Sequence, residues 1–336
     1  MKALALDFEA RTLGWSELDP PDFFANRDVL YRVHEVGVCG TDRALASFEL
    51  GRPPQGETRL VLGHEALGQV LEIGAGVKSL NRGDWVVPMV RRSCLPPCTS
   101  CGRGRRDLCI TGKYTERGIL GLHGYFTERA VDTEDDLVRV PLKLVDFGVL
   151  IEPLSIAEKA IVRALAVHEG EPRTALVLGL GPIGMLAAMA LKARGFAVRV
   201  QSIEPADHSR AAILRMQDIA YEPELKGSAD IVIEATGSTS AALFALDHLP
   251  PLGVLVVLGA PNGAGAVPFL RMIVNNQSVI GSVNADGEAF RAAVDDLARF
   301  DRGALAALIT RARFADLDRT LTAPPFAAPK IVHVLP

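Results

Sequence analysis

Hydrophobic and polar positions follow two different patterns along the chain, and the change falls near residue 174. In the first half, apolar and polar residues alternate over short segments separated by glycine, proline or polar clusters. Such alternation predicts half-buried strands, here at residues 30–40, 63–77 and 83–90. The pattern indicates a compact, partly barrel-like β domain. A helix is expected from about Pro153, because proline is favoured in the first helical turn.

The second half carries continuous apolar runs, which are typical of parallel strands buried on both faces. Strands are predicted at 174–181, 196–204, 229–237, 253–261 and 277–285, and helices at 182–195 and 288–300. We expect the terminal strand, 330–336, to rejoin the first domain. The prediction is an α/β protein with one domain over 1–155, completed by 290–336, and a second, doubly wound domain over 156–289.

Composition and charge narrow the possible functions. The chain has 336 residues, enough for two domains, and a net charge of -4 that gives no reason to expect a nucleic-acid partner or a membrane surface. No apolar stretch reaches membrane-spanning length, and the apolar run at the N-terminus is too short for a secretory signal. We therefore predict a soluble cytoplasmic protein that acts on a small molecule.

Four of the five cysteines fall in one short segment, residues 91–109, as Cys94, Cys98, Cys101 and Cys109. Four thiolates are a preferred ligand set for tetrahedral zinc, so this spacing predicts a structural zinc site. A disulfide pair or four free thiols are the alternatives. The odd cysteine total, without a secretory signal, argues against disulfides.

The fifth cysteine, Cys39, precedes a His64–Glu65 pair. Cysteine, histidine and a carboxylate would form a mixed metal site with one position left for water or substrate. Taken alone, His64 could be a buried structural histidine and Cys39 a small core residue. Their occurrence beside a thiolate segment and a nucleotide-binding turn favours the open metal site.

A glycine-rich turn follows the first predicted strand of the second domain, in the segment Gly179-Leu180-Gly181-Pro182-Ile183-Gly184. Between a strand and a helix, this spacing predicts dinucleotide binding, with the pyrophosphate at the helix N-terminus. Ser202 and Glu204 end the next strand, where the adenosine ribose should lie. A carboxylate there favours NAD over NADP, whereas Ser202 and Arg210 leave NADP possible.

The order of these motifs resembles that of the zinc-containing medium-chain dehydrogenases and reductases. The sequence between these motifs is similar to that of the archaeal-type glucose 1-dehydrogenase branch, over nearly the whole chain. The segments that carry this closer resemblance are VVPMVRR, TERGILGLHGYFTE, GVLIEPLSIAEKA and NNQSVIGSVNA.

The resemblance implies a GroES-like β-rich catalytic domain, a Rossmann domain, two zinc ions per subunit, NAD or NADP, and a homo-oligomer. It implies that Cys39 and His64 bind the catalytic zinc, and that Glu65 and Glu152 ligate it directly or through water. It also implies that Asp42 orients the imidazole and that Thr41 relays a proton. Glu116 and Asn284 would contact the sugar together with Thr41 and Glu152. The expected cofactor set is Gly179, Gly181, Pro182, Ile183, Gly184, Ser202, Glu204, Thr236, Gly237 and Asn284.

Two departures from the family pattern bear on these expectations. Three residues separate Cys94 from Cys98, where the family usually has two, although a turn with Pro96 and Pro97 can still close on zinc. Met89 stands where this branch often offers a polar side chain, and losing one polar partner at a buried hydroxyl costs about 1–3 kcal/mol.

The function that these features predict is hydride transfer from the C1 hydroxyl of an aldose, D-glucose first, to NAD(P)+, giving the lactone. A polyol or secondary-alcohol dehydrogenase is the nearest alternative. A non-catalytic relative that binds dinucleotide and zinc, and a zinc-free quinone reductase, are further alternatives.

Overall fold

The computed structural model describes residues 1–23, 25–224, 226–259, 263–323 and 329–336, which form two compact units. The first unit contains residues 1–152, 285–294 and 309–336, and the second contains 153–284 and 295–308. The sequence-based boundaries placed all of 290–336 in the first domain, whereas residues 295–308 pack with the second unit.

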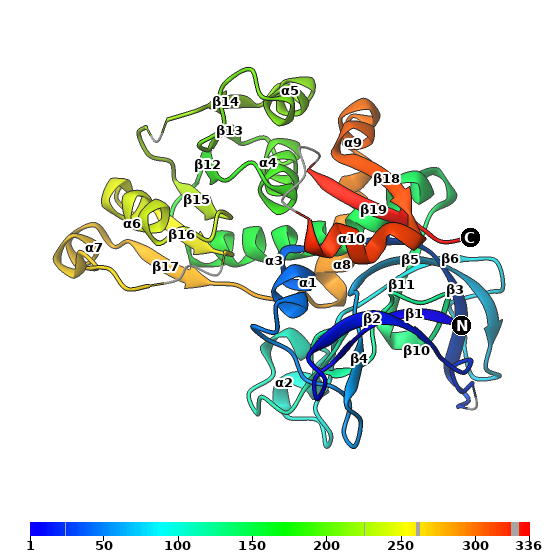
Figure 1. Ribbon diagram of the computed structural model, residues 1–336. Coiled ribbons are helices and arrows are strands. Elements are labelled where there is room, and N and C mark those ends of the chain that lie inside the picture. The colour runs from blue at the N-terminus through cyan, green and yellow to red at the C-terminus, as the bar shows by residue number, and fades with distance from the viewer. Residues whose placement is uncertain (24, 225, 260–262, 324–328) are drawn as a thin grey trace. The chain divides into compact units, whose positions relative to one another are not determined.

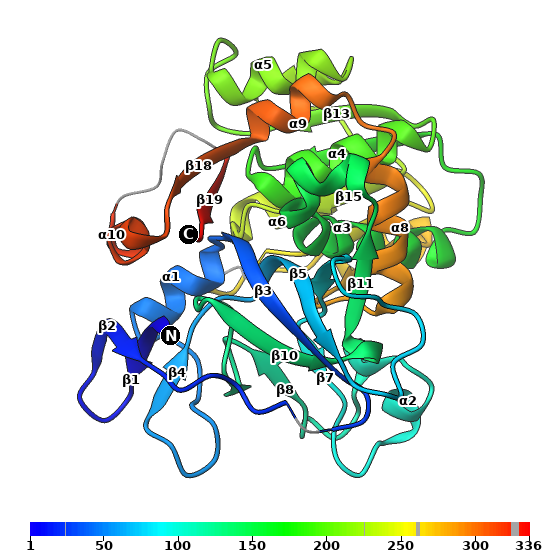
Figure 2. The same cartoon turned by 90° about the vertical axis from the view of Figure 1, so that its right-hand side faces the viewer.

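A seven-stranded sheet organises the first unit. Its strand order is β11-β6-β5-β3-β19-β18, and β10 also pairs with β3, as Figure 2 shows for β3, β5 and β10. The strands are β3 (Asp28–Gly37), β5 (Glu65–Ile73), β6 (Trp85–Pro88), β10 (Arg129–Thr133), β11 (Leu137–Val140), β18 (Ile309–Arg313) and β19 (Lys330–Val334). The predicted strands at 30–40, 63–77 and 83–90 are confirmed as β3, β5 and β6. The expected return of the terminal strand is also confirmed, because β19 pairs antiparallel with β3.

Two three-stranded sheets and several short helices complete the first unit. One sheet has the order β2-β1-β4, from Thr12–Glu17, Lys2–Asp7 and Arg59–Val61, and the other has the order β7-β8-β9, from Arg91–Arg92, Thr115–Arg117 and Gly121–Leu122. The α-helices are α1 (Gly40–Ala46), α2 (Thr99–Gly102) and α10 (Leu317–Thr322). The 3-10 helices are η1 (Arg106–Leu108), η2 (Glu134–Asp136), η3 (Leu142–Leu150) and η4 (Phe314–Asp316).

The second unit contains the parallel sheet that the apolar runs predicted. Its order is β14-β13-β12-β15-β16-β17, with every pairing parallel. The strands are β12 (Thr174–Leu178), β13 (Ala197–Gln201), β14 (Ala220–Glu222), β15 (Ile231–Glu234), β16 (Val254–Val257) and β17 (Ser278–Gly281). In sequence order this is 3-2-1-4-5-6, the doubly wound arrangement of dinucleotide-binding domains. The strand predicted at 253–261 ends at Val257, and its last two residues lie outside the described residues.

Helices accompany this sheet, as Figure 1 shows for α4 and α6. Helix α4 follows β12 directly and is almost wholly buried, which explains its alanine-rich sequence. The helices are α3 (Ile151–Val167), α4 (Pro182–Ala193), α5 (Ser209–Met216), α6 (Thr239–His248), α7 (Phe269–Asn275) and α9 (Arg302–Leu308). Helix α8 (Gly287–Leu297) belongs to the first unit as far as residue 294 and to the second unit beyond it. Within the part of the chain that is described, none of the helices has the length and apolar character needed to span a bilayer.

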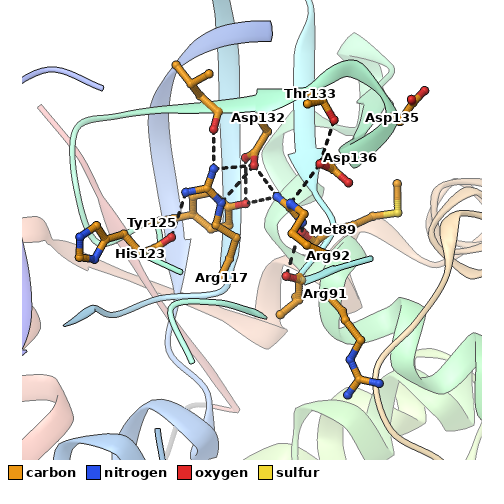
Figure 3. A network of polar contacts seen from close by, with 12 residues as sticks. Met89, Arg91, Arg92, Arg117, His123, Tyr125, Asp132, Thr133, Asp135 and Asp136 are labelled. Carbon is orange, nitrogen blue, oxygen red and sulfur yellow. Dashed lines mark hydrogen bonds and ion pairs between the residues drawn. The ribbon is translucent and has the colours of Figure 1, made fainter. Parts of the chain in front are cut away.

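A buried ionic cluster ties the small β7-β8-β9 sheet to the large one. Asp132 of β10 is 4% exposed and forms ion pairs with Arg92 of β7 and Arg117 of β8. It also accepts hydrogen bonds from the hydroxyls of Tyr31, at 2.6 Å, and Tyr125, at 2.9 Å. Figure 3 shows the two guanidinium groups converging on this carboxylate. Burial raises the pKa of Asp132, but the two arginines outweigh it and bring the pKa down to about 2.

Asp132→Asn should therefore destabilise the first unit strongly. The substitution removes the carboxylate that Arg92 and Arg117 share, and among the described residues only Arg92 has a second carboxylate partner, Asp136. Breaking comparable buried pairs costs about 3–5 kcal/mol. Urea unfolding of both proteins measures the difference. The carboxylate stabilises the fold above its ordinary pKa of 3.8, so the difference should persist at neutral pH and shrink as the pH falls toward 2.

Asp7→Asn is the matched control, because Asp7 pairs with Arg59 on the surface and should change the unfolding free energy much less. Equal losses for the two variants would contradict the role assigned to Asp132.

Candidate metal and dinucleotide sites

One buried carboxylate positions both side chains of the predicted open metal site. Cys39 is the residue before α1, and its backbone N–H donates to Asp42 Oδ2 at 2.8 Å. The other oxygen of Asp42 lies 3.2 Å from Nδ1 of His64. Asp42 thus fixes the start of α1 and the imidazole together, and it leaves Nε2 of His64 available to a metal.

His64 lies in the sharp turn that leads into β5. Gly63 has φ +90°, and a Cβ at this position would overlap the ring of the fully buried Phe126. Only glycine can adopt this positive φ and also leave room for the Phe126 ring at low cost. The turn brings one ligand atom each from Cys39, His64 and Glu65 within 4.8 Å of one another.

The charges around this cluster fit a cation. Glu65 is 1% exposed, and its Oε1 has no hydrogen-bond partner among the described residues. Burial and the charge of Glu65 raise the pKa of Glu152 to about 8. Two neighbouring buried carboxylates are costly without a cation, so this donor set suits a metal ion. Thr41 lies beside it, with Oγ1 3.9 Å from the Cys39 sulfur.

The four remaining cysteines converge as predicted, and the longer turn between Cys94 and Cys98 does not prevent it. The four sulfur atoms lie within 4.8 Å of one another. Cys94 Sγ is 3.7 Å from Cys101 Sγ, and Cys98 Sγ is 4.0 Å from Cys109 Sγ. Thiolates at about 2.3 Å from a tetrahedral zinc stand about 3.8 Å apart, whereas a disulfide needs about 2.05 Å. The geometry fits a closed zinc site.

The pKa values of the clustered cysteines differ, because their surroundings differ. Hydrogen bonds from the backbone of Cys101 and Ile110 lower the pKa of Cys98 to about 6. Burial raises the pKa of Cys101 to about 12. A cation is therefore required to keep all four side chains as thiolates at neutral pH.

Glu116 is not a solvated loop residue. It lies on β8 at 9% exposure, and its Oε1 is 2.9 Å from both Nε and Nη2 of Arg91. Arg91 also donates to the carbonyl of Asp107 at 3.0 Å and lies over the ring of Tyr114. Figure 3 shows Arg91 pointing away from the Asp132 cluster that holds its neighbour Arg92. The carboxylate of Glu116 is thus fixed in one orientation.

The glycine turn of the second unit has the geometry that a pyrophosphate requires. Gly179 has φ +111°, and a Cβ at Gly184 would clash with the carbonyl oxygen of Gly179. Gly181 is the N-cap of α4, and no side-chain cap bond occupies that end. The N–H groups of the first turn are therefore left for an anion.

A cavity of about 470 Å³ opens beside this turn. Ser202 and Glu204 line it, and the Ser202 hydroxyl donates to the Glu204 carboxylate. The full lining is Leu178, Gly179, Leu180, Gly181, Gln201, Ser202, Ile203, Glu204, Pro223, Ala235, Thr236, Ser238, Ser240 and Ala241. Of the expected cofactor residues, Gly179, Gly181, Ser202, Glu204 and Thr236 line the cavity, whereas Pro182, Ile183, Gly184, Gly237 and Asn284 are outside its lining. Asn284 adopts a left-handed conformation after β17, with φ +61°.

Two charged residues near these sites were missed from the sequence. Glu234 ends β15, is fully buried, and accepts the backbone N–H groups of Thr236 and Gly237 at 2.6 and 2.9 Å, which shapes that turn. Lys330 begins β19 and pairs with Glu65. A charged residue at the end of a largely apolar strand was the available signal in both cases.

Comparison with known proteins places these sites in a family. The family model described as "Glucose dehydrogenase C-terminus" matches residues 145–326, and the one described as "Alcohol dehydrogenase GroES-like domain" matches residues 25–142. Glucose 1-dehydrogenase 1 of Vulcanisaeta moutnovskia is 43% identical over 292 residues, 82% of each chain. Glucose 1-dehydrogenase of Thermoproteus tenax is 39% identical over 285 residues, 80% of each chain.

The fold is shared with a solved structure over nearly its full length. Glucose dehydrogenase of Haloferax mediterranei, in complex with NADP, Zn and gluconolactone, superposes with a TM-score of 0.90 at 31% identity and covers 99% of both chains. The two-domain fold with its GroES-like and Rossmann parts defines a zinc-containing medium-chain dehydrogenase. Within that superfamily, the chain belongs to the archaeal-type glucose dehydrogenase branch.

Asp42→Asn should weaken metal binding at the open site while the fold is kept. The asparagine can still accept the Cys39 N–H, but its neutral side chain no longer stabilises the imidazole as the carboxylate does. Loss of such a partner lowers metal affinity by about 10–100-fold. Competition with a chromogenic chelator measures the affinity, and Glu49→Gln, at an exposed position shortly after α1, is the control. An unchanged affinity in Asp42→Asn would refute the orienting role.

Proposed function

We propose that the chain is a zinc-dependent dehydrogenase that oxidises the C1 hydroxyl of an aldose to the lactone, with NAD+ or NADP+ as hydride acceptor. D-Glucose is the first candidate substrate. The observation that carries the proposal is the convergence of Cys39, His64 and Glu65 in a chain that also has the dinucleotide turn at Gly179. The names of its relatives support the choice of sugar.

Each residue of the metal cluster has a proposed part. Cys39 and His64 would hold a zinc ion, and Glu65 and Glu152 would complete its coordination directly or through water. When bound, the zinc would supply Lewis-acid chemistry that lowers the pKa of the substrate hydroxyl. Thr41, beside the Cys39 sulfur, would accept the hydroxyl proton and pass it toward solvent. The hydride leaves the same carbon for the nicotinamide, so the sugar loses two electrons and two hydrogens.

Substrate recognition is assigned to Glu116 and Asn284. Arg91 fixes Glu116 through one carboxylate oxygen, so the proposed sugar contact is made by a pre-oriented group. Met89 is 5% exposed and can offer a sugar hydroxyl only its thioether sulfur, a weak hydrogen-bond acceptor. This residue supports the second candidate, a polyol or secondary alcohol with fewer hydroxyl groups to satisfy.

Coenzyme choice is assigned to the end of β13. The Glu204 carboxylate, fixed by the Ser202 hydroxyl, would accept the ribose hydroxyls and repel a 2′-phosphate. Arg210 lies close to the same turn, with Nη1 3.4 Å from the carbonyl of Leu180, and would favour the phosphate. We propose NAD as the preferred coenzyme.

Initial rates of coenzyme reduction over a panel of aldoses, polyols and secondary alcohols, with NAD and NADP in parallel, test the function. We expect D-glucose to be among the best substrates and NAD to give the higher kcat/KM. Cys39→Ala should abolish turnover, because the zinc loses its thiolate. Activity confined to polyols would replace the aldose with the second candidate, and full activity of Cys39→Ala would reject the zinc mechanism.

We further propose that the chain forms a homo-oligomer through the end of its parallel sheet. Helix α7 has no buried residue, and its apolar side chains are 68–76% exposed at Phe269, Leu270, Ile273 and Val274. A two-turn helix with so little burial is not stable alone. The adjoining strand β17 is the edge of the sheet and has one strand partner among the described residues. Figure 1 shows α7 next to β17, the last strand of the parallel sheet.

A second copy of the chain is the proposed occupant of this surface. An edge strand can pair with its own symmetry mate across a two-fold axis, which makes the surface self-complementary and buries α7 at the same time. Leu270→Lys should therefore shift the protein toward the monomer in sedimentation-velocity experiments. Leu142→Lys, at 80% exposure on the first unit, is the control and should leave the assembly unchanged. An assembly that survives Leu270→Lys would place the interface elsewhere.

A further inference from the structure

A buried lysine contacts the carboxylate of the open metal site. Lys330, the first residue of β19, is 2% exposed and forms an ion pair with Oε2 of Glu65, which is 1% exposed. Its ammonium group also donates to the carbonyl of Val38 at 3.1 Å. Burying a lysine is costly unless a carboxylate compensates it. Lys330 is not one of the metal ligands proposed above, and it is not part of the proposed proton path.

The register of the sheet explains how the two side chains meet. Gly37 of β3 pairs with Glu65 of β5 on one side and with Val332 of β19 on the other. Lys330 is two residues before Val332, so both side chains are on the same face of the sheet. A Cβ at Gly37 would clash with Glu65 Oε2 and lie 2.9 Å from Lys330 Cε. The missing side chain of Gly37 is the space in which the ion pair forms.

This ion pair competes with a metal for the same carboxylate. Glu65 offers one oxygen to the cluster with Cys39 and His64, while its Oε2 is held by an ammonium group. The positive charge of Lys330 attracts Glu65 away from a neighbouring cation and repels that cation as well. A carboxylate without this partner would be free to become a fourth permanent ligand and close the open position.

We infer that Lys330 is a positioning residue that keeps Glu65 an exchangeable ligand of the metal rather than a permanent one. The inference rests on the metal site of the proposed function, but it is independent of which sugar or alcohol is the substrate. Lys330, far from Glu65 in sequence, would thereby control whether Glu65 occupies the coordination position of the metal that the substrate needs.

Zinc release to an excess of chromogenic chelator, followed over time in the purified holoprotein, tests this role. Wild-type protein should release one zinc quickly, from the open site, and one slowly, from the four cysteines. Lys330→Met should slow the fast phase about tenfold, the scale on which neighbours of metal ligands alter metal binding. Lys330→Gln, which can keep the hydrogen bond to Val38, should have the same effect and serves if the methionine variant does not fold. Lys330→Arg should release zinc at the wild-type rate.

The double variant Lys330→Met with Glu65→Gln separates the carboxylate from general effects on the fold. It should restore the fast release, because the Glu65 carboxylate that Lys330 holds back is then no longer present to capture the metal. Lys159→Met is the matched control. Lys159 is a buried lysine of the second unit, 4% exposed, whose ammonium donates to the carbonyl of Val283 at 2.8 Å. Its loss should leave the fast phase unchanged.

Cobalt-substituted protein gives a second measurement that does not depend on turnover. The visible absorption of Co²⁺ reports its coordination, so Lys330→Met should show a changed spectrum that no longer responds to added substrate alcohol. Unchanged or faster zinc release in both Lys330→Met and Lys330→Gln, with lowered stability, would show a purely structural ion pair and overturn the inference. A wild-type protein that contains only the slowly released zinc of the four cysteines would show that the open metal site is not a metal site. That result would overturn the inference as well.

Discussion

The bridging role of Asp42 is the constraint on which the open metal site depends. Its carboxylate is fully buried, accepts the Cys39 N–H through one oxygen and approaches His64 through the other. A thiol and an imidazole from two separate segments are thereby fixed before any metal arrives. Organisation of this kind lowers the ordering cost of metal binding, because the ligand side chains do not need to be immobilised at that moment.

Buried carboxylates of the first unit are paired with arginine side chains at Asp132 and Glu116, whereas the metal clusters are not balanced in this way. Asp132 is compensated by Arg92 and Arg117, and Glu116 by Arg91. By contrast, Lys330 is the only ammonium group among the described residues that pairs with Glu65, while burial and the charge of Glu65 raise the pKa of Glu152 to about 8. The surplus of acidic groups at this one place is the electrostatic reason to expect a cation there.

The sequence predicted those parts of the protein whose signals are local. The strands β12, β13 and β15 follow from continuous apolar runs, and the cysteine spacing anticipated the convergence of the four sulfur atoms. Lys330 could not be assigned in this way, because its contact with Glu65 depends on the pairing of β19 with β3 and on the missing side chain at Gly37. Glu116 illustrates the same limit, since its partner Arg91 is identified only by the β7–β8 register.

Gly37 shows that a position without a side chain can decide the chemistry of its neighbours. Strands β5, β3 and β19 are adjacent in the sheet, so any larger residue at position 37 would separate Glu65 from Lys330. With the two groups separated, each would remain buried without its counter-charge, at a cost of several kcal/mol. The backbone register, the glycine and the ion pair therefore form one unit of structure. The position of the Glu65 carboxylate is therefore a consequence of sheet packing as much as of the ligands themselves.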